Sequence, residues 1–128
     1  MIQRTVISAI DQSPLNRGLK GVDWVNDPRN IPIVEGDDIA LFDYEDFGIY
    51  QVHVLYESRG RAAIDFTKRA FARMFEDHGA QAIFGLVPDF RRDVKLLARW
   101  TGMKYVGKRS TDCGLCELFV LAKDMWKR

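Results

Sequence analysis

Residues 49–63, IYQVHVLYESRGRAA, decide the fold of this 128-residue chain. Their first part, Ile49 to Tyr56, is rich in β-branched and aromatic residues, which favour a strand. From Ala62 to Asp77 apolar residues recur every three or four positions, which predicts an amphipathic helix. His78 and Gly79 then provide a stop signal. The stretch therefore connects a strand directly to the clearest helix in the sequence.

Two further strands are predicted before this stretch. Ile31 to Val34 and Asp38 to Tyr44 are separated from each other, and from Ile49 to Tyr56, by short polar or glycine-containing links. Links of this length favour antiparallel hairpins. Gln3 to Ile10 fits either a short strand or the start of a helix. Asp11 to Arg29 is punctuated by glycine, proline and asparagine, which predicts a loop with at most a short helical turn.

After the long helix the sequence alternates between strand and helix. Ala82 to Val87 is a continuous apolar run, which is typical of a strand buried on both faces. Asp89 is a candidate N-cap for a second helix, and Gly102 ends that helix. Lys104 to Lys108 and Glu117 to Lys123 are the last predicted strands, joined by a polar loop, and we expect the second of them at a sheet edge. The inward face of the second helix is predicted to contain Val94, Leu97, Ala98 and Thr101.

These elements predict one domain over residues 1–128 of the α/β (α+β) class. Its mixed central sheet would have antiparallel N-terminal strands, a parallel β-α-β core and two main helices. The central strand–helix–strand connection is expected to be right-handed, as nearly all such parallel connections are.

The composition restricts the classes of function. The formal net charge is +1, which gives no reason to expect nucleic acid or an anionic membrane as the partner. The sequence has no apolar run long enough to span a bilayer and no signal-peptide pattern at Met1 to Ile10, so we expect a cytoplasmic protein. Cys113 and Cys116 lack the second pair of ligands that a zinc site needs, so no metal is predicted.

The junction between strand and long helix has the chemistry of an anion site. A helix start leaves backbone N–H groups without partners and carries partial positive charge, so it attracts phosphate. Gly60 allows a ligand to approach the backbone, and Ala62 and Ala63 are small enough not to obstruct it. Arg59 and Arg61 add charged donors. The alternative is a basic helix start to which nothing binds.

Val52 to Ala63 resembles motif A of the GNAT N-acetyltransferases, in which a strand enters an Arg/Gln-x-x-Gly-x-Gly/Ala turn. Arg91 to Met103 is similar to the second helix of that family. The resemblance follows the element order from about Ile39 to Val120. The motif can be aligned with this turn in two ways, and the turn departs from it in both. If Arg59 leads, Ile64 stands where the motif ends in Gly or Ala; if Glu57 leads, an acid stands where the motif begins with Arg or Gln.

The resemblance implies an acyl-CoA-dependent N-acyltransferase with acetyl-CoA (coenzyme A) bound at Arg59 to Ala63. Pantetheine would lie along a splayed third strand and pair with the main chain of Val52 and Val54. The acyl group would reach a cleft between that strand and Ala82 to Val87. The acceptor would be the amine of a small molecule or a protein.

The tyrosine that often protonates the departing thiolate in the family maps to about Ala98. An amine acceptor still needs a base. His53 and Glu57 are the candidate bases, because residues four apart on a strand share a face. Each has an ordinary alternative, as a half-buried strand histidine or a solvated carboxylate. Tyr50 and Tyr56 are alternative proton donors to the thiolate, or else core aromatics.

Residues outside the motif add a substrate-binding hypothesis. Trp24 lies in the region where many GNAT proteins have a substrate loop, and it either lines a pocket or packs over the sheet. Acidic residues near the strand connections could attract a cationic amine: Asp37, Asp38, Asp43, Glu45 and Asp46. Phe119, Met125 and Trp126 either pack internally or contact a second subunit.

Three functions therefore remain open at the level of sequence. The first is the transferase. The second is a non-catalytic GNAT-fold protein serving as a bacteriophage structural or assembly component, which would be associated with the virion, since fold alone does not fix function. Such a protein would contact virion proteins or form a homodimer. The third is a nucleic-acid-binding module that uses the basic faces of the two helices, and the near-zero net charge argues against it.

Overall fold

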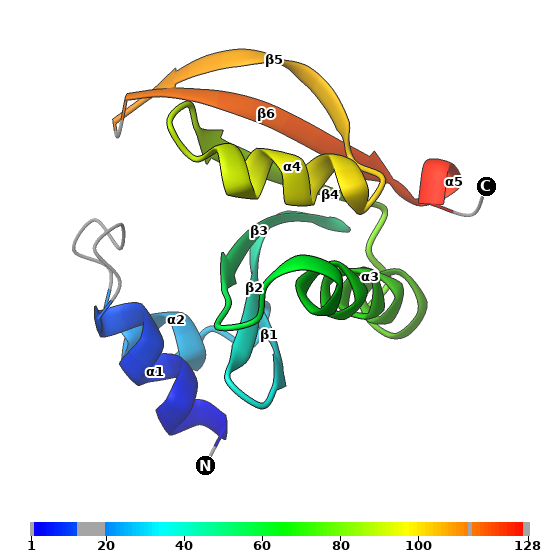
Figure 1. Ribbon diagram of the computed structural model, residues 1–128. Coiled ribbons are helices and arrows are strands. Elements are labelled where there is room, and N and C mark those ends of the chain that lie inside the picture. The colour runs from blue at the N-terminus through cyan, green and yellow to red at the C-terminus, as the bar shows by residue number, and fades with distance from the viewer. Residues whose placement is uncertain (1, 13–19, 113, 127–128) are drawn as a thin grey trace.

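The computed structural model describes residues 2–12, 20–112 and 114–126. Its centre is a six-stranded sheet with the strand order β1-β2-β3-β4-β6-β5 (Figure 1). In chain order the elements are α1 (Ile2–Gln12), α2 (Gly21–Asn26), β1 (Ile31–Glu35), β2 (Asp38–Asp46), β3 (Ile49–Leu55), α3 (Gly60–Asp77), β4 (Ala82–Pro88), α4 (Arg92–Trp100), β5 (Lys104–Thr111), β6 (Gly114–Ala122) and α5 (Lys123–Trp126).

The pairing of the strands confirms the predicted mixed sheet. β1, β2 and β3 form an antiparallel meander, and β3 pairs with β4 in parallel across the connection made by α3. β4 then pairs antiparallel with β6, and β6 with β5. The α/β class and the β-α-β core predicted from the sequence are therefore present.

Helices α3 and α4 pack together with one face of the sheet and form the main core. The apolar positions predicted for α3 are buried, and so is Ala98 of α4. Phe42 of β2 and Phe119 of β6 are completely buried in the same cluster, and Phe42 packs edge-to-face against Phe71. The buried residues of α3 are Ala63, Phe66, Thr67, Ala70, Phe71, Met74 and Phe75.

Helices α1 and α2 form a second, smaller core on the opposite face of β2. Residues 2–12 are helical, which settles the open choice between strand and helix, and α2 is the short turn expected in the following loop. Trp24 packs with Ile39 and Leu41 in this cluster, whereas the next residue of β2, Phe42, packs in the main core. Because successive strand residues point to opposite faces, the two cores lie on opposite sides of the sheet.

Several predicted boundaries and positions were wrong. Helix α3 begins at Gly60 rather than Ala62, so Arg59 is its N-cap. Asp89 does not cap α4, whose N-cap is Arg91, because the Asp89 N–H donates to the Leu115 carbonyl of β6 at 3.0 Å and the Arg91 N–H donates to that of Pro88 at 2.9 Å.

The last hairpin also differs from its prediction. Its strands extend through most of the predicted polar loop, since β5 continues to Thr111 and β6 begins at Gly114. β6 is an inner strand and β5 is the edge strand, the reverse of the expectation. Cys116 is buried as a free thiol, while the prediction for Cys113 lies outside the described residues.

The C-terminal aromatic residues pack inside the molecule where they are described. Phe119 is in the main core, and the ring of Trp126 stacks on Phe75 with centroids 5.0 Å apart. The sequence left open whether Phe119, Met125 and Trp126 pack internally or contact a second subunit. In the structure all three pack in or against the main core.

Candidate active site

Strands β3 and β4 separate after a short paired segment. Their parallel pairing covers Ile49–Gln51 and Ala82–Phe84 and, within the described residues, goes no further. The other edge of β3 stays paired with β2 as far as Leu55, and the other edge of β4 with β6 as far as Pro88. Beyond Gln51 and Phe84, the facing edges of the two strands therefore have main-chain groups without strand partners.

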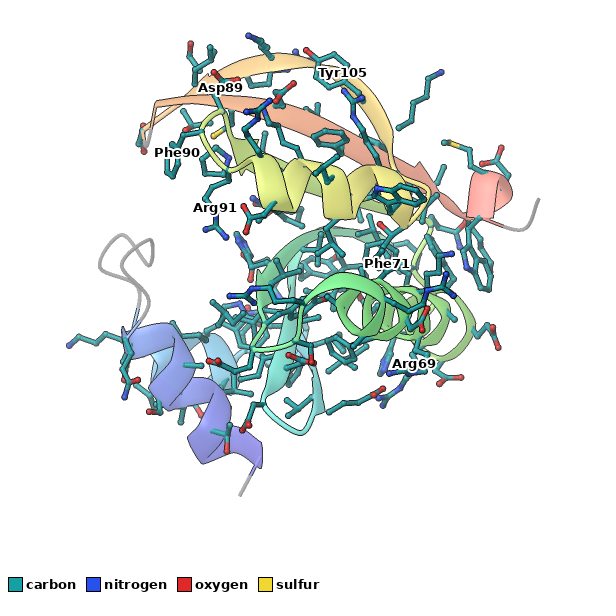
Figure 2. The ribbon with its side chains drawn as sticks, viewed as in Figure 1. Arg69, Phe71, Asp89, Phe90, Arg91 and Tyr105 are labelled. Atoms are coloured by element: carbon teal, nitrogen blue, oxygen red, sulfur yellow. The ribbon has the colours of Figure 1, made fainter. Side chains whose placement is uncertain are left out.

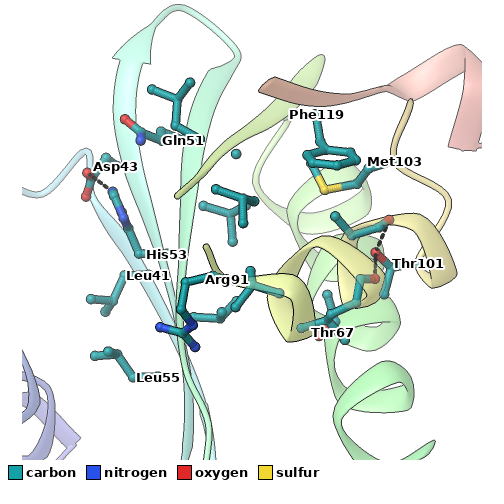
Figure 3. Close-up of a pocket in the computed structure, with 18 of the residues that line it drawn as sticks. Leu41, Asp43, Gln51, His53, Leu55, Thr67, Arg91, Thr101, Met103 and Phe119 are labelled. Atoms are coloured by element: carbon teal, nitrogen blue, oxygen red, sulfur yellow. Dashed lines mark hydrogen bonds and ion pairs between the residues drawn. The ribbon is translucent and has the colours of Figure 1, made fainter. Parts of the chain in front are cut away.

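A cavity of about 490 Å³ occupies this separation (Figure 3). Its size is typical of small-molecule sites. Its walls come from both cores, because Thr67, Phe71 and Ala98 lie on the α3–α4 side whereas Trp24, Leu41 and His53 lie on the α1–α2 side. The cavity therefore passes between the strands from one face of the sheet to the other. Its lining also includes Val52, Val54, Leu55, Gly85, Arg91 and Met103.

The turn from β3 into α3 leaves its helix start open. Gly60 has φ 60°, and a Cβ built there meets no described atom within 4 Å. Arg61 and Ala62 are exposed, and among the described residues no side chain caps the helix. The first N–H groups of α3 thus remain accessible to an anion. Ala63 is buried and Ile64 partly buried, so neither forms the exposed surface of the turn.

The Arg59 guanidinium folds back over the turn. Its Nη1 donates to the carbonyl oxygens of Tyr56 at 3.0 Å and of Ser58 at 3.1 Å. The sequence assigned Arg59 to direct contact with an anion. In the structure this side chain also braces the turn that holds the helix start in place.

Asp38 holds the same turn from strand β2. It is 8% exposed, and its Oδ1 accepts hydrogen bonds from the N–H groups of Glu57 and Ser58, each at 2.9 Å. Burial of the Asp38 carboxyl acts to raise its pKa, but hydrogen bonds from the hydroxyl and N–H of Ser58 and the N–H of Glu57 outweigh burial and hold the pKa below its usual value.

Replacing Asp38 with alanine is therefore expected to destabilise the protein by about 1 to 3 kcal/mol at neutral pH, because two N–H groups lose a charged acceptor. Urea unfolding of Asp38→Ala, with the exposed neighbour Asp37→Ala as control, measures this. Since the pKa of Asp38 is lowered in the folded state, its contribution to the free energy of unfolding is complete above the unfolded pKa of about 4. That contribution is lost as the pH falls through the folded pKa. If wild type remained more stable than Asp38→Ala by the same amount in strong acid, this role of the Asp38 carboxylate would be contradicted.

His53, Asp43 and Trp24 form a hydrogen-bonded chain at the α1–α2 end of the cavity. His53 Nε2 lies 2.7 Å from Asp43 Oδ2 (Figure 3). Trp24 Nε1–H donates to Asp43 Oδ1. The His53 side chain is 45% exposed and that of Asp43 is 25% exposed. An ionised carboxylate only accepts hydrogen bonds, so the proton between His53 and Asp43 belongs to Nε2. In the neutral form of the ring, Nδ1 then carries the lone pair that can take a proton.

The structure does not bring Glu57 together with His53. Strand β3 ends at Leu55, so the period-two spacing that joins the two residues in the sequence does not continue to Glu57. Glu57 is exposed and does not line the cavity. Tyr56 is held by Thr67, whose Oγ1 lies 2.7 Å from the phenol oxygen, and burial raises the pKa of Tyr56 far above its usual value.

Arg91 brings a positive charge to the cavity at the start of α4. Its Nε donates to Asp93 Oδ1 at 3.1 Å and its Nη2 to Asp93 Oδ2 at 3.2 Å. Figure 2 shows the side chain directed from the β4–α4 connection towards the space between α4 and the N-terminal part of the sheet. Arg91 is the N-cap residue of α4 and belongs to the cavity lining.

The pairing of Asp43 with His53 was missed in the sequence, where Asp43 was grouped with loop acids. The signal lay in the register of β2 and β3. Leu41 is directly opposite His53 and Asp43 opposite Gln51, so Asp43 is the diagonal neighbour of His53 on the same face.

Trp24 meets both expectations made for it, since it is 4% exposed, packs over the sheet and lines the cavity.

The described residues contain no group of three or more histidine, cysteine, aspartate or glutamate side chains placed to hold a metal ion. Their helices also include none with the length and apolar character needed to cross a membrane.

Comparison with known proteins shows the fold. No protein-family model matches the sequence, and no curated protein matches it. Among solved structures, a chimera of spermidine N-acetyltransferase SpeG from Vibrio cholerae and hSSAT has a TM-score of 0.76 at 9% identity, with 98% of this chain and 92% of that chain covered. Aminoglycoside acetyltransferase AAC(6')-Ib with coenzyme A and kanamycin has a TM-score of 0.71 at 12% identity, with 100% and 91% covered.

A second structure of AAC(6')-Ib, in complex with ribostamycin and coenzyme A, has a TM-score of 0.64 at 12% identity and covers 75% of this chain, which spans only 64% of that protein. These similarities, together with the strand order and the separated β3 and β4, show that the chain has the fold of the GNAT acetyltransferases. The resemblance inferred from residues 52–63 is thus confirmed at the level of fold.

Proposed function

We propose that the protein is an acyl-CoA-dependent N-acyltransferase that uses acetyl-CoA. Two observations carry this proposal: the cavity between β3 and β4 is lined from both faces of the sheet, and α3, which follows β3, has an uncapped start. Structures of AAC(6')-Ib with a similar fold are complexes with coenzyme A, which supports the choice of cofactor. The same comparisons give no support to a virion component.

The N-terminal turn of α3 would hold the pyrophosphate of the cofactor. The N–H groups that follow Arg59 are unpartnered by described side chains, and Gly60 leaves the approach to them open. Arg61 can add a charged donor from its exposed position. The pantetheine amides would pair with the free main-chain edge of β3 at Val52 and Val54, in place of the missing strand partner.

His53, which lines the cavity on its α1–α2 side, would act as the general base. Its Nδ1 can accept a proton from the acceptor ammonium, while Asp43 fixes the ring and stabilises the imidazolium that forms. Acetyl-CoA supplies the activated thioester. The amine nitrogen bonds to the acyl carbon as the carbon–sulfur bond breaks, the first amine proton passes through His53 to water, and the second ends on the departing sulfur.

Calorimetric titration with coenzyme A tests the proposal without knowledge of the acceptor. We expect saturable binding, and acetyl-CoA at about 100 times its dissociation constant should stabilise the folded protein by about 2.7 kcal/mol, which a thermal shift detects. Binding should weaken as salt is added, because charged groups meet the pyrophosphate. Absence of both heat and thermal shift at millimolar ligand would refute the cofactor assignment.

A further inference from the structure

The α1–α2 end of the cavity, where the acceptor would bind, has an apolar wall. It consists of Ile10 from α1, Trp24 from α2, Leu41 from β2 and Leu55 from β3. Trp24 and Leu41 are 4% and 5% exposed, and both belong to the core cluster beneath α1 and α2. Such a wall favours an apolar body, because its contact removes hydrocarbon from water on both sides.

The charges of the cavity restrict the acceptor further. Among the described residues of its lining, Asp43 is the sole carboxylate and Arg91 the sole lysine or arginine. Asp43 already serves two partners, His53 and the indole of Trp24. A second ammonium group on the acceptor would therefore be removed from water without a carboxylate of its own, which is costly. It would also share the cavity with the Arg91 guanidinium.

We propose that the acceptor is a small primary amine with one positive charge and an apolar, aromatic body. The proposal rests on the transferase function argued above. It separates this chain from the aminoglycoside and spermidine acetyltransferases that share its fold, whose named substrates carry several amino groups. The acceptor has to be small because the cavity of about 490 Å³ also receives the arm of the cofactor. Its ammonium group would lie at His53 and its body against Trp24.

The test compares acceptors at saturating acetyl-CoA. Thiol release and mass spectrometry of the acetylated product are followed with 2-phenylethylamine, tryptamine, spermidine and kanamycin. We expect kcat/KM for the aromatic monoamines to exceed that for spermidine and kanamycin by about 100-fold or more, since unpaired buried charge discriminates strongly between ligands. Calorimetry on the protein–coenzyme A complex should give the same order of binding.

A pair of variants at Leu55 isolates the effect of charge. Leu55 is partly buried, and aspartate and asparagine have the same shape there but differ in charge. Leu55→Asp is expected to raise kcat/KM for spermidine about 10-fold or more relative to Leu55→Asn, because it supplies the missing carboxylate. Equal values for spermidine in two folded variants would contradict the electrostatic argument.

The outcomes distinguish this inference from the proposed function. If wild-type protein acetylates spermidine or kanamycin better than the aromatic monoamines, the acceptor class is wrong and the transferase assignment stands. If coenzyme A binds but no monoamine is bound or acetylated, the acceptor class is again wrong while the cofactor site remains. If coenzyme A does not bind, both proposals fail together.

Discussion

Gly60→Val is expected to abolish coenzyme A binding, with at least a 100-fold rise in the dissociation constant. The side chain would enter the open space before the first N–H groups of α3, where the pyrophosphate has to lie. A loss of about 2.7 kcal/mol of binding free energy corresponds to this factor. The measurement is the calorimetric titration with coenzyme A.

The matched control for this variant is Gly36→Val. Gly36 lies between β1 and β2, has φ 59° against 60° for Gly60, and also has no described atom within 4 Å of an added Cβ. Both substitutions place a β-branched residue in the left-handed region, so both should cost about 1 to 2 kcal/mol of folding stability. Only Gly60→Val should lose the ligand. Equal affinity in the two variants would remove the helix start from the cofactor site.

His53→Ala is expected to lower kcat at least 100-fold, with little change in the affinity for coenzyme A. General-base catalysis contributes a factor of about 10² to 10⁴, and the imidazole lines the cavity whereas the residues of the proposed pyrophosphate site do not. Steady-state thiol release, together with calorimetric titration of coenzyme A, measures the two quantities.

The other histidine provides the control, because the chain has two. His78→Gln changes the exposed residue that follows α3 and should retain the wild-type rate. Asp43→Asn should lower kcat about 10-fold or more, since its amide can donate to Nε2 and favour the tautomer with the proton on Nδ1. A kcat for His53→Ala equal to that for His78→Gln would show that another group is the base.

Local patterns were sufficient to predict most of the elements. The spacing of Phe66, Phe71 and Phe75 predicted α3, because helical periodicity depends on neighbours a few residues apart. Gly60 and Arg61 have no apolar side chains, so the same periodicity could not show that the helix already includes them. Asp89 is a favourable capping residue, but the hydrogen bond from its N–H to the Leu115 carbonyl of β6 fixes it in a turn before α4.

Long-range pairing explains what local patterns could not predict. The inner position of β6 depends on its pairing with β4, whose residues precede it by about thirty positions. At the candidate site, the sequence joined His53 to Glu57 by spacing, whereas the register between β2 and β3 joins His53 to Asp43. The open helix start at Gly60 was easier to predict, because the strand, the turn and the helix are consecutive in the chain.

The short contact between β3 and β4 has a mechanical consequence. Three residue pairs join the two halves of the sheet, Ile49–Gln51 with Ala82–Phe84. Fewer residues pair between β3 and β4 than between any other neighbouring strands. Relative movement of the two halves of the sheet therefore breaks the fewest main-chain hydrogen bonds at this contact. A ligand that forms hydrogen bonds to the free edges of both β3 and β4 would connect the two halves of the sheet and make them move as one body.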